Sequence, residues 1–223
     1  MKKIIFAIFS LLMGLQASLF CNEEDPSMVK QVNQAFYSTR ADRFEKIPFS
    51  HLLPFLFQHY SESLPGKKVL DVGSGPGALS QWIQKKGYDV FCLDPNKEMI
   101  KRCKEKGLPC INSYFEDYET DETYDHIFAL SSLMHIPKKD IRPQLSKVSK
   151  MLNPGGIFYV SVILGRDDNW QDIGSTSPER YFYAYEKEDF LEMFHRDFSL
   201  IEQHEIFVPK TRKTFLLAVM RKV

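Results

Sequence analysis

The chain of 223 residues carries 29 basic and 29 acidic side chains, so its formal net charge is zero. Such a balance creates no long-range field that would attract nucleic acid or an acidic membrane, and no nucleic-acid partner is indicated. The hydrophobic fraction of 43% and charged fraction of 26% are those of an ordinary globular domain with one core. The four cysteines and six histidines show no metal-ligand spacing, so we expect no metal site.

The amino terminus differs from the rest of the chain. Lys2 and Lys3 precede an apolar run over residues 4–20, which is the pattern of a secretory signal or a membrane anchor. A true start at Met28 and a locally used apolar helix are the other interpretations. Residues 22–27 are polar and read as a linker. We therefore expect a signal-like or anchor segment with its linker over residues 1–27, followed by one domain over residues 28–223.

Two helices are predicted before the first strand, and together they form an amino-terminal helical cap over residues 28–64. Residues 28–43 place Val29, Val32 and Phe36 at helical spacing. Residues 48–60 carry a wide apolar stripe with a proline at the start. The first of these helices is either a solvated cover for the domain or a lid over a site.

Apolar runs then alternate with helical segments of about ten residues. The predicted strands are residues 67–72, 88–93, 109–112, 123–130 and 157–164, and the predicted helices are residues 78–86, 96–106 and 140–152. This alternation is typical of a doubly wound parallel sheet. Residues 153–156, Asn-Pro-Gly-Gly, predict a sharp turn before the fifth strand.

The carboxyl-terminal part of the chain predicts an irregular loop, a helix and a closing pair of strands. The loop spans residues 165–178, the helix spans residues 187–194, and two apolar runs follow at residues 204–208 and 214–220. We read the two runs as an antiparallel hairpin at the edge of the sheet. The fold class is therefore α/β, with a doubly wound, mostly parallel, seven-stranded Rossmann-like sheet that ends in an antiparallel carboxyl-terminal hairpin strand.

Residues 69–78 read Val-Leu-Asp-Val-Gly-Ser-Gly-Pro-Gly-Ala, which is a strand, a glycine-rich turn and a helix start. The turn satisfies the dinucleotide fingerprint and by itself does not separate NAD from S-adenosylmethionine. Charge separates them better, because Asp71 would repel a pyrophosphate and attract an ammonium or sulfonium group. Asp94, at the end of the second strand, is placed to accept ribose hydroxyls of either ligand, and it also serves as a helix cap.

Four segments in the same order resemble the motifs of class I S-adenosylmethionine-dependent methyltransferases. They are residues 69–77, 93–99, 124–130 and 151–156, and with the closing hairpin the resemblance covers roughly residues 49–223. The chain is most similar to the small-molecule group that includes quinone and lipid-precursor methylating enzymes. The resemblance implies S-adenosyl-L-methionine as cofactor and in-line transfer of its methyl group to a small-molecule acceptor. A cofactor made in the cytoplasm argues against export, so the location stays open.

The resemblance also implies roles for individual residues. The glycines would let the backbone approach the methionine part closely, Asp71 would balance its ammonium group, and Asp94 would hold the ribose. The full set of cofactor-binding candidates is Asp71, Gly73, Ser74, Gly75, Gly77, Asp94, Pro95, Met99, Phe115, Glu116, Ser131, Tyr37 and Arg40. Many relatives have an acid after the third strand for the adenine amino group, and here Tyr114 stands at that place, with Glu116 as a substitute.

Methyl transfer from a sulfonium needs a positioned acceptor more than a set of catalytic groups, and it needs a base only if the acceptor must lose a proton. His135 is the candidate base, with loop packing as its alternative role. Residues 166–170 and 180–185 either shape the acceptor pocket or form a surface hairpin. Two other functions stay open at this point: an NAD-dependent oxidoreductase and a cofactor-binding scaffold without turnover.

Overall fold

The computed structural model describes residues 25–45, 52–62, 66–166, 169–171, 180–194, 196–209 and 211–223. Residues 1–24, which carry the signal or anchor interpretation and the first half of the linker, lie outside the described residues. In the described part, none of the helices combines the length and the apolar character that crossing a membrane requires.

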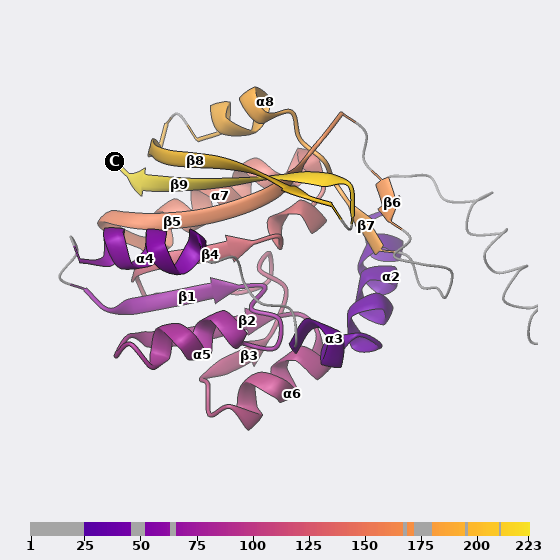
Figure 1. The fold of residues 1–223 in the computed structure, drawn as a ribbon, viewed down its shortest axis with the longest axis horizontal. Helices are drawn as coiled ribbons and strands as arrows, with labels where there is room; N and C mark the ends of the chain where they lie inside the picture. Colours follow the sequence, from indigo (N-terminus) through magenta and orange to yellow (C-terminus); the bar gives the residue numbers. More distant parts are fainter. Residues whose placement is uncertain are drawn as a thin grey trace, which may run out of the picture.

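A seven-stranded sheet forms the centre of the molecule, with strand order β3-β2-β1-β4-β5-β9-β8 (Figure 1). Its strands are β1 (Lys68–Val72), β2 (Asp89–Asp94), β3 (Cys110–Asn112), β4 (Tyr124–Leu130), β5 (Leu152–Leu164), β8 (Phe198–Val208) and β9 (Lys213–Lys222). The first five strands run parallel, whereas β9 is antiparallel to β5 and β8 is antiparallel to β9. The predicted fold class is confirmed, and the strand order reverses between β1 and β4, where ligands bind in open α/β sheets.

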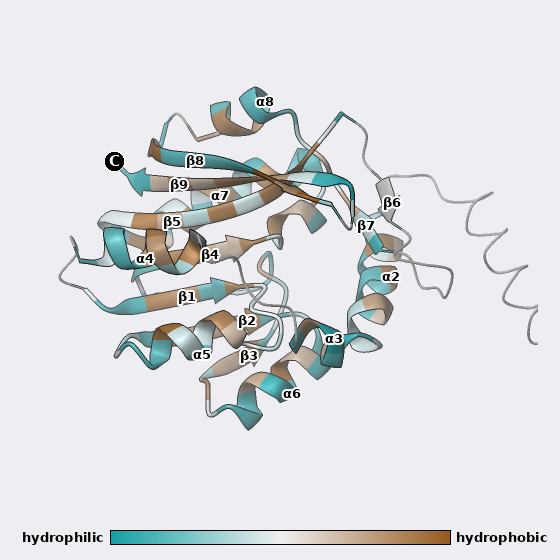
Figure 2. Cartoon of the chain, in the orientation of Figure 1, coloured by the Kyte–Doolittle hydropathy of each residue, from teal (hydrophilic) through white to brown (hydrophobic). Residues whose placement is uncertain are grey.

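Helices cover both faces of the sheet (Figure 1). They are α2 (Pro26–Ser38), α3 (Ala41–Glu45), α4 (Leu52–Ser61), α5 (Ala78–Gln84), α6 (Lys97–Glu105), the short 3₁₀ helix η1 (Leu133–His135), α7 (Lys138–Met151) and α8 (Lys187–Glu192). Strand side chains alternate between two buried clusters: Leu70 and Ile127 pack toward α7, and Val69 and Phe128 pack toward α4 and α5. Hydrophobic residues accordingly concentrate along the central strands (Figure 2).

The helical cap differs from its prediction in detail. The first helix begins at Pro26, because Asp25 caps it by accepting a hydrogen bond from the Ser27 backbone N–H at 2.9 Å. A turn at Thr39 and Arg40 then separates α2 from α3, so the predicted single helix over residues 28–43 is wrong at its end. The start of the second predicted helix, residues 48–51, lies outside the described residues.

The Asn-Pro-Gly-Gly segment is also different from its prediction. The structure contains it within β5, where Tyr124 pairs with Leu152 and His126 pairs with Ile157. A step of two residues along β4 is thus matched by a step of five residues along β5. The extra residues of β5 form a bulge, in which Gly155 has a φ of +75°. The turn-forming residues therefore bend a continuous strand, and the expected turn before residue 157 is wrong.

A second, two-stranded sheet joins the segment predicted as a loop, residues 165–178, to the following segment, residues 180–185, for which a surface hairpin was one of the predictions. It pairs β6 (Asn169–Gln171) with β7 (Arg180–Phe182) in antiparallel register. The helix α2 crosses the carboxyl-terminal edge of the main sheet and lies against β7 (Figure 1). These two elements close a space above the parallel strands, and this space holds the candidate site.

Candidate active site

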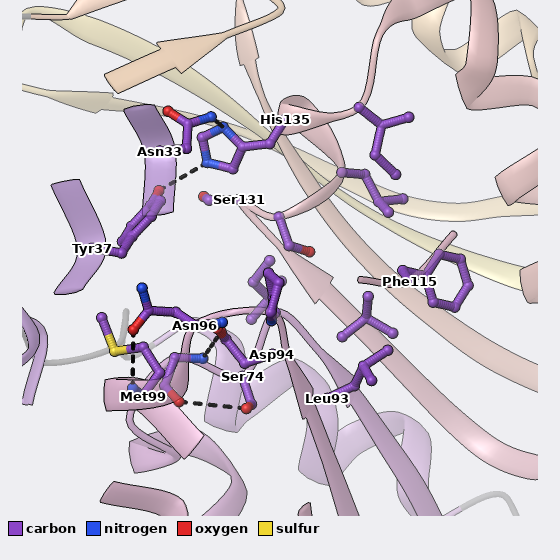
Figure 3. A pocket seen from close by; sticks show the side chains of 18 of the residues that line it. Asn33, Tyr37, Ser74, Leu93, Asp94, Asn96, Met99, Phe115, Ser131 and His135 are labelled. Atoms are coloured by element: carbon purple, nitrogen blue, oxygen red, sulfur yellow. Dashed lines mark hydrogen bonds between the residues drawn. The ribbon is translucent and has the colours of Figure 1, made fainter. Parts of the chain in front are cut away.

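A cavity of about 650 Å³ opens above the carboxyl ends of β1, β2, β3 and β4, with α2 and β7 opposite them. This volume is within the range of small-molecule and cofactor sites. The cavity has two walls of different origin. One, which we call the cofactor wall, consists of the turns that follow β1, β2 and β3. The other, the acceptor wall, consists of side chains from α2, α4, the end of β4, η1, β7 and the β8–β9 hairpin. Figure 3 shows Tyr37 and His135 of this wall across the cavity from Asp94.

The glycine turn forms the floor of the cofactor wall. Its first N–H groups, of Gly73 and Ser74, both donate to the Leu93 carbonyl, at 2.7 and 3.1 Å, which ties the turn to the end of β2. All three glycines have positive φ, a region in which other residues are strained. A Cβ on Gly75 would meet no protein atom within 4 Å, because this residue faces the open cavity. The space beside Gly75 is the cradle that a close-lying ligand would fill.

Asp94 holds the turn and also faces the cavity. Its Oδ2 accepts from the Gly75 N–H at 2.8 Å, and its Oδ1 accepts from the Asn96 N–H at 2.8 Å. Burial raises the pKa of Asp94 to about 6, although the two backbone N–H groups favour the carboxylate. Each oxygen keeps a further lone pair, so the carboxylate can also accept hydroxyl groups of a bound sugar.

Asp71 lies beneath the turn and does not line the cavity. It is 3% exposed, and its Oδ2 accepts from the Ser80 hydroxyl at 2.5 Å. Burial raises the pKa of Asp71 to about 6, and the hydrogen bond from Ser80 opposes that rise. Its charge therefore acts on the cavity from behind the turn, so the predicted balance of the cofactor's ammonium group would be indirect, as through a bridging water.

The far end of the cofactor wall is formed by residues after β2 and β3. Pro95, Met99, Phe115 and Glu116 all line the cavity as expected. Tyr114 stands at the place of the expected acid, and its hydroxyl accepts a hydrogen bond from Gln34 Nε2 at 3.1 Å.

Helix α2 makes polar contacts with the loops that form this end of the cavity. Lys30 pairs with Glu116 at 3.1 Å and lies over the Tyr114 ring at 4.3 Å. Asn96 Nδ2 donates to Gln34 Oε1 and to the Ser38 hydroxyl, both at 2.9 Å. The helix is thus bound to the same loops that form the cofactor wall.

His135 is the centre of the acceptor wall. The Tyr37 hydroxyl lies 2.8 Å from its Nε2, and Arg180 donates to the same hydroxyl at 3.2 Å (Figure 3). Burial and, to a smaller extent, the neighbouring Arg180 charge together lower the pKa of His135 to about 4. His135 is therefore neutral at physiological pH.

Ser131 lines the cavity at the end of β4 with φ +55°, a left-handed conformation that is uncommon for serine. Its backbone N–H is held by both the carbonyl and the hydroxyl of Ser161, at 3.0 and 2.9 Å. A strained residue held in this way is typical of a functional site.

The rest of the acceptor wall is apolar. Its members come from α4 and the β8–β9 hairpin: Leu53, Ile206, Val208, Phe215 and Leu217. This half of the cavity is therefore apolar apart from the polar cluster around His135.

Two other predicted residues lie away from the cavity. Gly77 is the N-cap of α5 with φ +78°, and a Cβ there would come within 2.6 Å of Leu108 Cδ1. Arg40 lies over the Phe36 ring at 4.3 Å and does not line the cavity. Of the segments expected to shape the acceptor pocket, Arg180 does line it, whereas residues 167, 168 and 172–179 lie outside the described residues.

Three residues of α2, Lys30, Asn33 and Gln34, were missed by the sequence analysis. They are polar residues on an amphipathic helix, and nothing in the sequence distinguishes them from solvated positions. The lid interpretation of this helix was the one signal that pointed to them.

Comparison with known proteins identifies the domain. Residues 69–156, which contain the glycine turn, Asp94 and β4, match the family model of a methyltransferase domain. The chain thus contains a methyltransferase domain, as its resemblance to the class I S-adenosylmethionine-dependent methyltransferases predicts. The matched residues contribute most of the cofactor wall, and α2, β7 and the closing hairpin lie outside them.

Curated proteins similar to this chain are named as methyltransferases. Ubiquinone biosynthesis O-methyltransferase of Aliivibrio fischeri is 34% identical over 127 residues, which are 52% of this chain and 53% of the relative. Squalene methyltransferase 1 of Botryococcus braunii is 30% identical over 162 residues, which are 60% of this chain and 42% of the relative. The chain thus spans about half the length of the curated relatives it matches.

Solved methyltransferases share the fold over most of the chain. The 1,6-didemethyltoxoflavin-N1-methyltransferase of Burkholderia thailandensis, with bound 1,6-didemethyltoxoflavin and S-adenosylhomocysteine, has a TM-score of 0.69 at 16% identity and covers 89% of this chain and 90% of its own. The N-methyltransferase NodS of Bradyrhizobium japonicum, in complex with S-adenosylhomocysteine, has a TM-score of 0.56 at 16% identity and covers 83% of this chain and 98% of its own. At such identities the likeness concerns the fold.

Proposed function

We propose that this chain moves the methyl group of S-adenosyl-L-methionine to a small-molecule acceptor by in-line displacement. The observation that carries the proposal is one cavity in which the methyltransferase glycine turn and Asp94 face a polar, partly buried cluster around His135. When bound, the cofactor supplies an electrophilic methyl carbon on a sulfonium. The chain's own residues bind it, orient the acceptor and exclude water.

The residues of the cofactor wall fit such a ligand. Gly75 leaves open the space for its methionine part, and Asp94 presents lone pairs for the ribose hydroxyls. Pro95, Met99 and Phe115 supply apolar surface for the adenine ring. With Tyr114 in place of the usual acid, we assign the polar edge of the adenine to Glu116.

For the acceptor we propose a phenol or enol with an apolar substituent. The apolar residues of α4 and the β8–β9 hairpin would surround the substituent, and His135 would face the hydroxyl. The printed names of the relatives, a ubiquinone biosynthesis O-methyltransferase and a squalene methyltransferase, support an acceptor of this polarity. In this proposal His135 is the base and Tyr37 is its hydrogen-bonded partner, rather than a ligand of the cofactor carboxylate.

Calorimetry with S-adenosylhomocysteine and with NAD tests the cofactor. We expect binding of the first and none of the second, because the carboxylates behind and beside the glycine turn disfavour a pyrophosphate. Binding of NAD alone would favour the oxidoreductase that the sequence left open.

A radiolabelled methyl-transfer screen with phenol, quinol and amine acceptors tests turnover. Transfer to phenols with apolar substituents is the expected result. Tight cofactor binding without transfer to any acceptor would favour the scaffold. Membrane association through residues 1–20 remains a prediction. Mass spectrometry of the native amino terminus would tell a cleaved signal from a chain that starts at Met1 or at Met28.

A further inference from the structure

The Tyr181 peptide of β7 is held by the side chain of Asn33 from α2. Asn33 Oδ1 accepts from the Tyr181 N–H at 2.8 Å, and Asn33 Nδ2 donates to the Tyr181 carbonyl at 3.0 Å. Asn33 is 7% exposed, so these bonds are shielded from water. Because the N–H of Tyr181 needs an acceptor and its carbonyl needs a donor, the amide of Asn33 has only one orientation that satisfies both.

The same carbonyl decides where the proton of His135 lies. His135 Nδ1 is 2.8 Å from the Tyr181 oxygen, and a carbonyl oxygen can only accept. Nδ1 must therefore carry the proton of the neutral ring. Asn33 Nδ2, 3.2 Å from Nδ1, is likewise a donor, so both N–H groups share the Tyr181 carbonyl. Figure 3 shows the Asn33 and Tyr37 side chains directed at opposite parts of the His135 ring.

The other ring nitrogen is left as an acceptor on the cavity side. In this tautomer Nε2 has one lone pair, and the Tyr37 hydroxyl donates to it at 2.8 Å. The Tyr37 oxygen also accepts from Arg180, and both Tyr37 and His135 line the cavity. Among the described residues, Tyr37 of α2 and Arg180 of β7 are the titratable and charged groups in this network around His135.

We propose that Asn33 is a positioning residue for catalysis: through the Tyr181 carbonyl it fixes His135 as the Nδ1–H tautomer, so that Nε2 serves as the proton acceptor of the site. The inference rests on the proposed function for its catalytic meaning. The geometry of the tautomer itself does not depend on the identity of the acceptor.

The proton path follows from this arrangement. The acceptor oxygen forms a bond to the methyl carbon as the carbon–sulfur bond breaks, and the electron pair of that bond stays on sulfur. The acceptor's hydroxyl proton passes to the Tyr37 oxygen while the Tyr37 proton passes to His135 Nε2. The positive charge of the sulfonium is thereby replaced by that of an imidazolium, whose proton is later released to water. The opposite tautomer would have no lone pair at Nε2 to receive it.

Nitrogen-15 spectra of the histidine rings test the tautomer directly, since the protonated and unprotonated ring nitrogens resonate far apart. His135 is assigned by comparison with His135→Gln. The expected result for the wild-type protein without ligands is a neutral ring protonated at Nδ1 between pH 6 and 8. A ring protonated at Nε2, or a mixture of tautomers, would overturn the inference.

The variant Asn33→Asp tests the role of Asn33. The carboxylate still accepts from the Tyr181 N–H but cannot donate to its carbonyl, and it places a negative charge beside Nδ1–H. We expect the pKa of His135 to rise by about one unit or more, with the acid limb of the kcat profile moving with it. The matched control is Gln31→Glu, the same amide-to-acid change at an exposed position of α2. Equal titration of His135 in the two variants would refute the role of Asn33.

The two proposals fail in different ways. A wild-type protein that has the Nδ1–H tautomer but binds no S-adenosylhomocysteine would refute the proposed function. A protein that transfers methyl groups with His135 protonated at Nε2 would refute this inference alone. Because the tautomer is measured on the free wild-type protein, the test remains decisive even if Asn33→Asp does not fold.

Discussion

The two walls of the cavity differ in how far apart their residues lie in the sequence. The cofactor wall comes from three consecutive strand ends, residues 73–76, 93–99 and 113–116. The acceptor wall is built around His135, which contacts Asn33, 102 positions away in the sequence, and the carbonyl of Tyr181, 46 positions away. A wall built from neighbouring segments, such as the cofactor wall, can be recognised as a sequence motif. A wall built from distant segments, such as the acceptor wall, changes whenever the packing of one of its elements changes.

The walls also differ in their chemistry. The cofactor wall presents backbone groups of the glycine turn and the carboxylate of Asp94, which the N–H groups of Gly75 and Asn96 hold in place. The acceptor wall uses side chains whose protonation depends on neighbours from other elements. Changes in the first wall should therefore act on cofactor affinity, and changes in the second should act on turnover.

The largest effect is expected at Gly75. The variant Gly75→Val places a branched side chain in the cradle at a φ of +55°, and we expect cofactor affinity to fall more than about a hundredfold, or about 3 kcal/mol. Gly87→Val is the control, since Gly87 has a φ of +87° and equally open surroundings at the end of α5, away from the cavity. Calorimetry with S-adenosylhomocysteine measures both. Equal affinities of the two variants for S-adenosylhomocysteine would show that the glycine turn is not part of the cofactor site.

Asp94→Ala comes next. Loss of the carboxylate removes the expected charge-assisted bonds to the ribose and releases the Gly75 N–H, so affinity should weaken by about 1–3 kcal/mol. Asp89→Ala, at the exposed start of the same strand, should leave affinity unchanged. If both variants bind as the wild type does, Asp94 is only a structural support for the turn.

Asp71→Asn should act mainly on stability. Burial raises the folded-state pKa of Asp71 from 3.8 to about 6, so the folded protein binds the proton more tightly than the unfolded chain does. This group therefore favours folding at low pH, and its ionisation costs stability as pH rises from about 4 to 6. An asparagine avoids that cost, and we expect a gain of about 1–2 kcal/mol at pH 7.5 that shrinks toward pH 5.

Urea unfolding at the two pH values measures this effect, with the exposed Asp117→Asn as control. Cofactor affinity of Asp71→Asn should weaken less than tenfold, because the carboxylate acts from behind the turn. A gain in stability that is the same at pH 5 and pH 7.5 would contradict a buried, ionised Asp71.

The smallest effect on cofactor affinity is expected for Tyr37→Phe. The variant removes the hydroxyl between Arg180 and His135, so turnover should fall about tenfold while cofactor affinity changes less than twofold. Tyr118→Phe is the control, because it removes a buried hydroxyl bonded to Tyr124 outside the cavity. Loss of affinity equal to the loss of turnover would place Tyr37 on the cofactor wall, as the sequence first suggested.

The sequence by itself determined the sheet and the cofactor wall. Strand periodicity, the glycines and the acids at strand ends are local signals, and parallel strands bring their carboxyl ends to one edge whatever the details of packing. Residues 73–75, Asp94 and Met99 were therefore found in advance. Local turn chemistry was less reliable, since the glycines at residues 155 and 156 became a bulge once β4 and β5 paired.

Tertiary structure alone decided the acceptor wall and the protonation of its histidine. The burial of Asp71 beneath the turn depends on how α5 packs, because Ser80 of this helix donates a hydrogen bond to the Asp71 carboxylate. The tautomer of His135 depends on a carbonyl of β7 that Asn33 holds from α2. Hydrogen bonds between residues so distant leave no periodicity or spacing in the sequence, because their geometry exists only after the sheet has formed and the cap has closed over it.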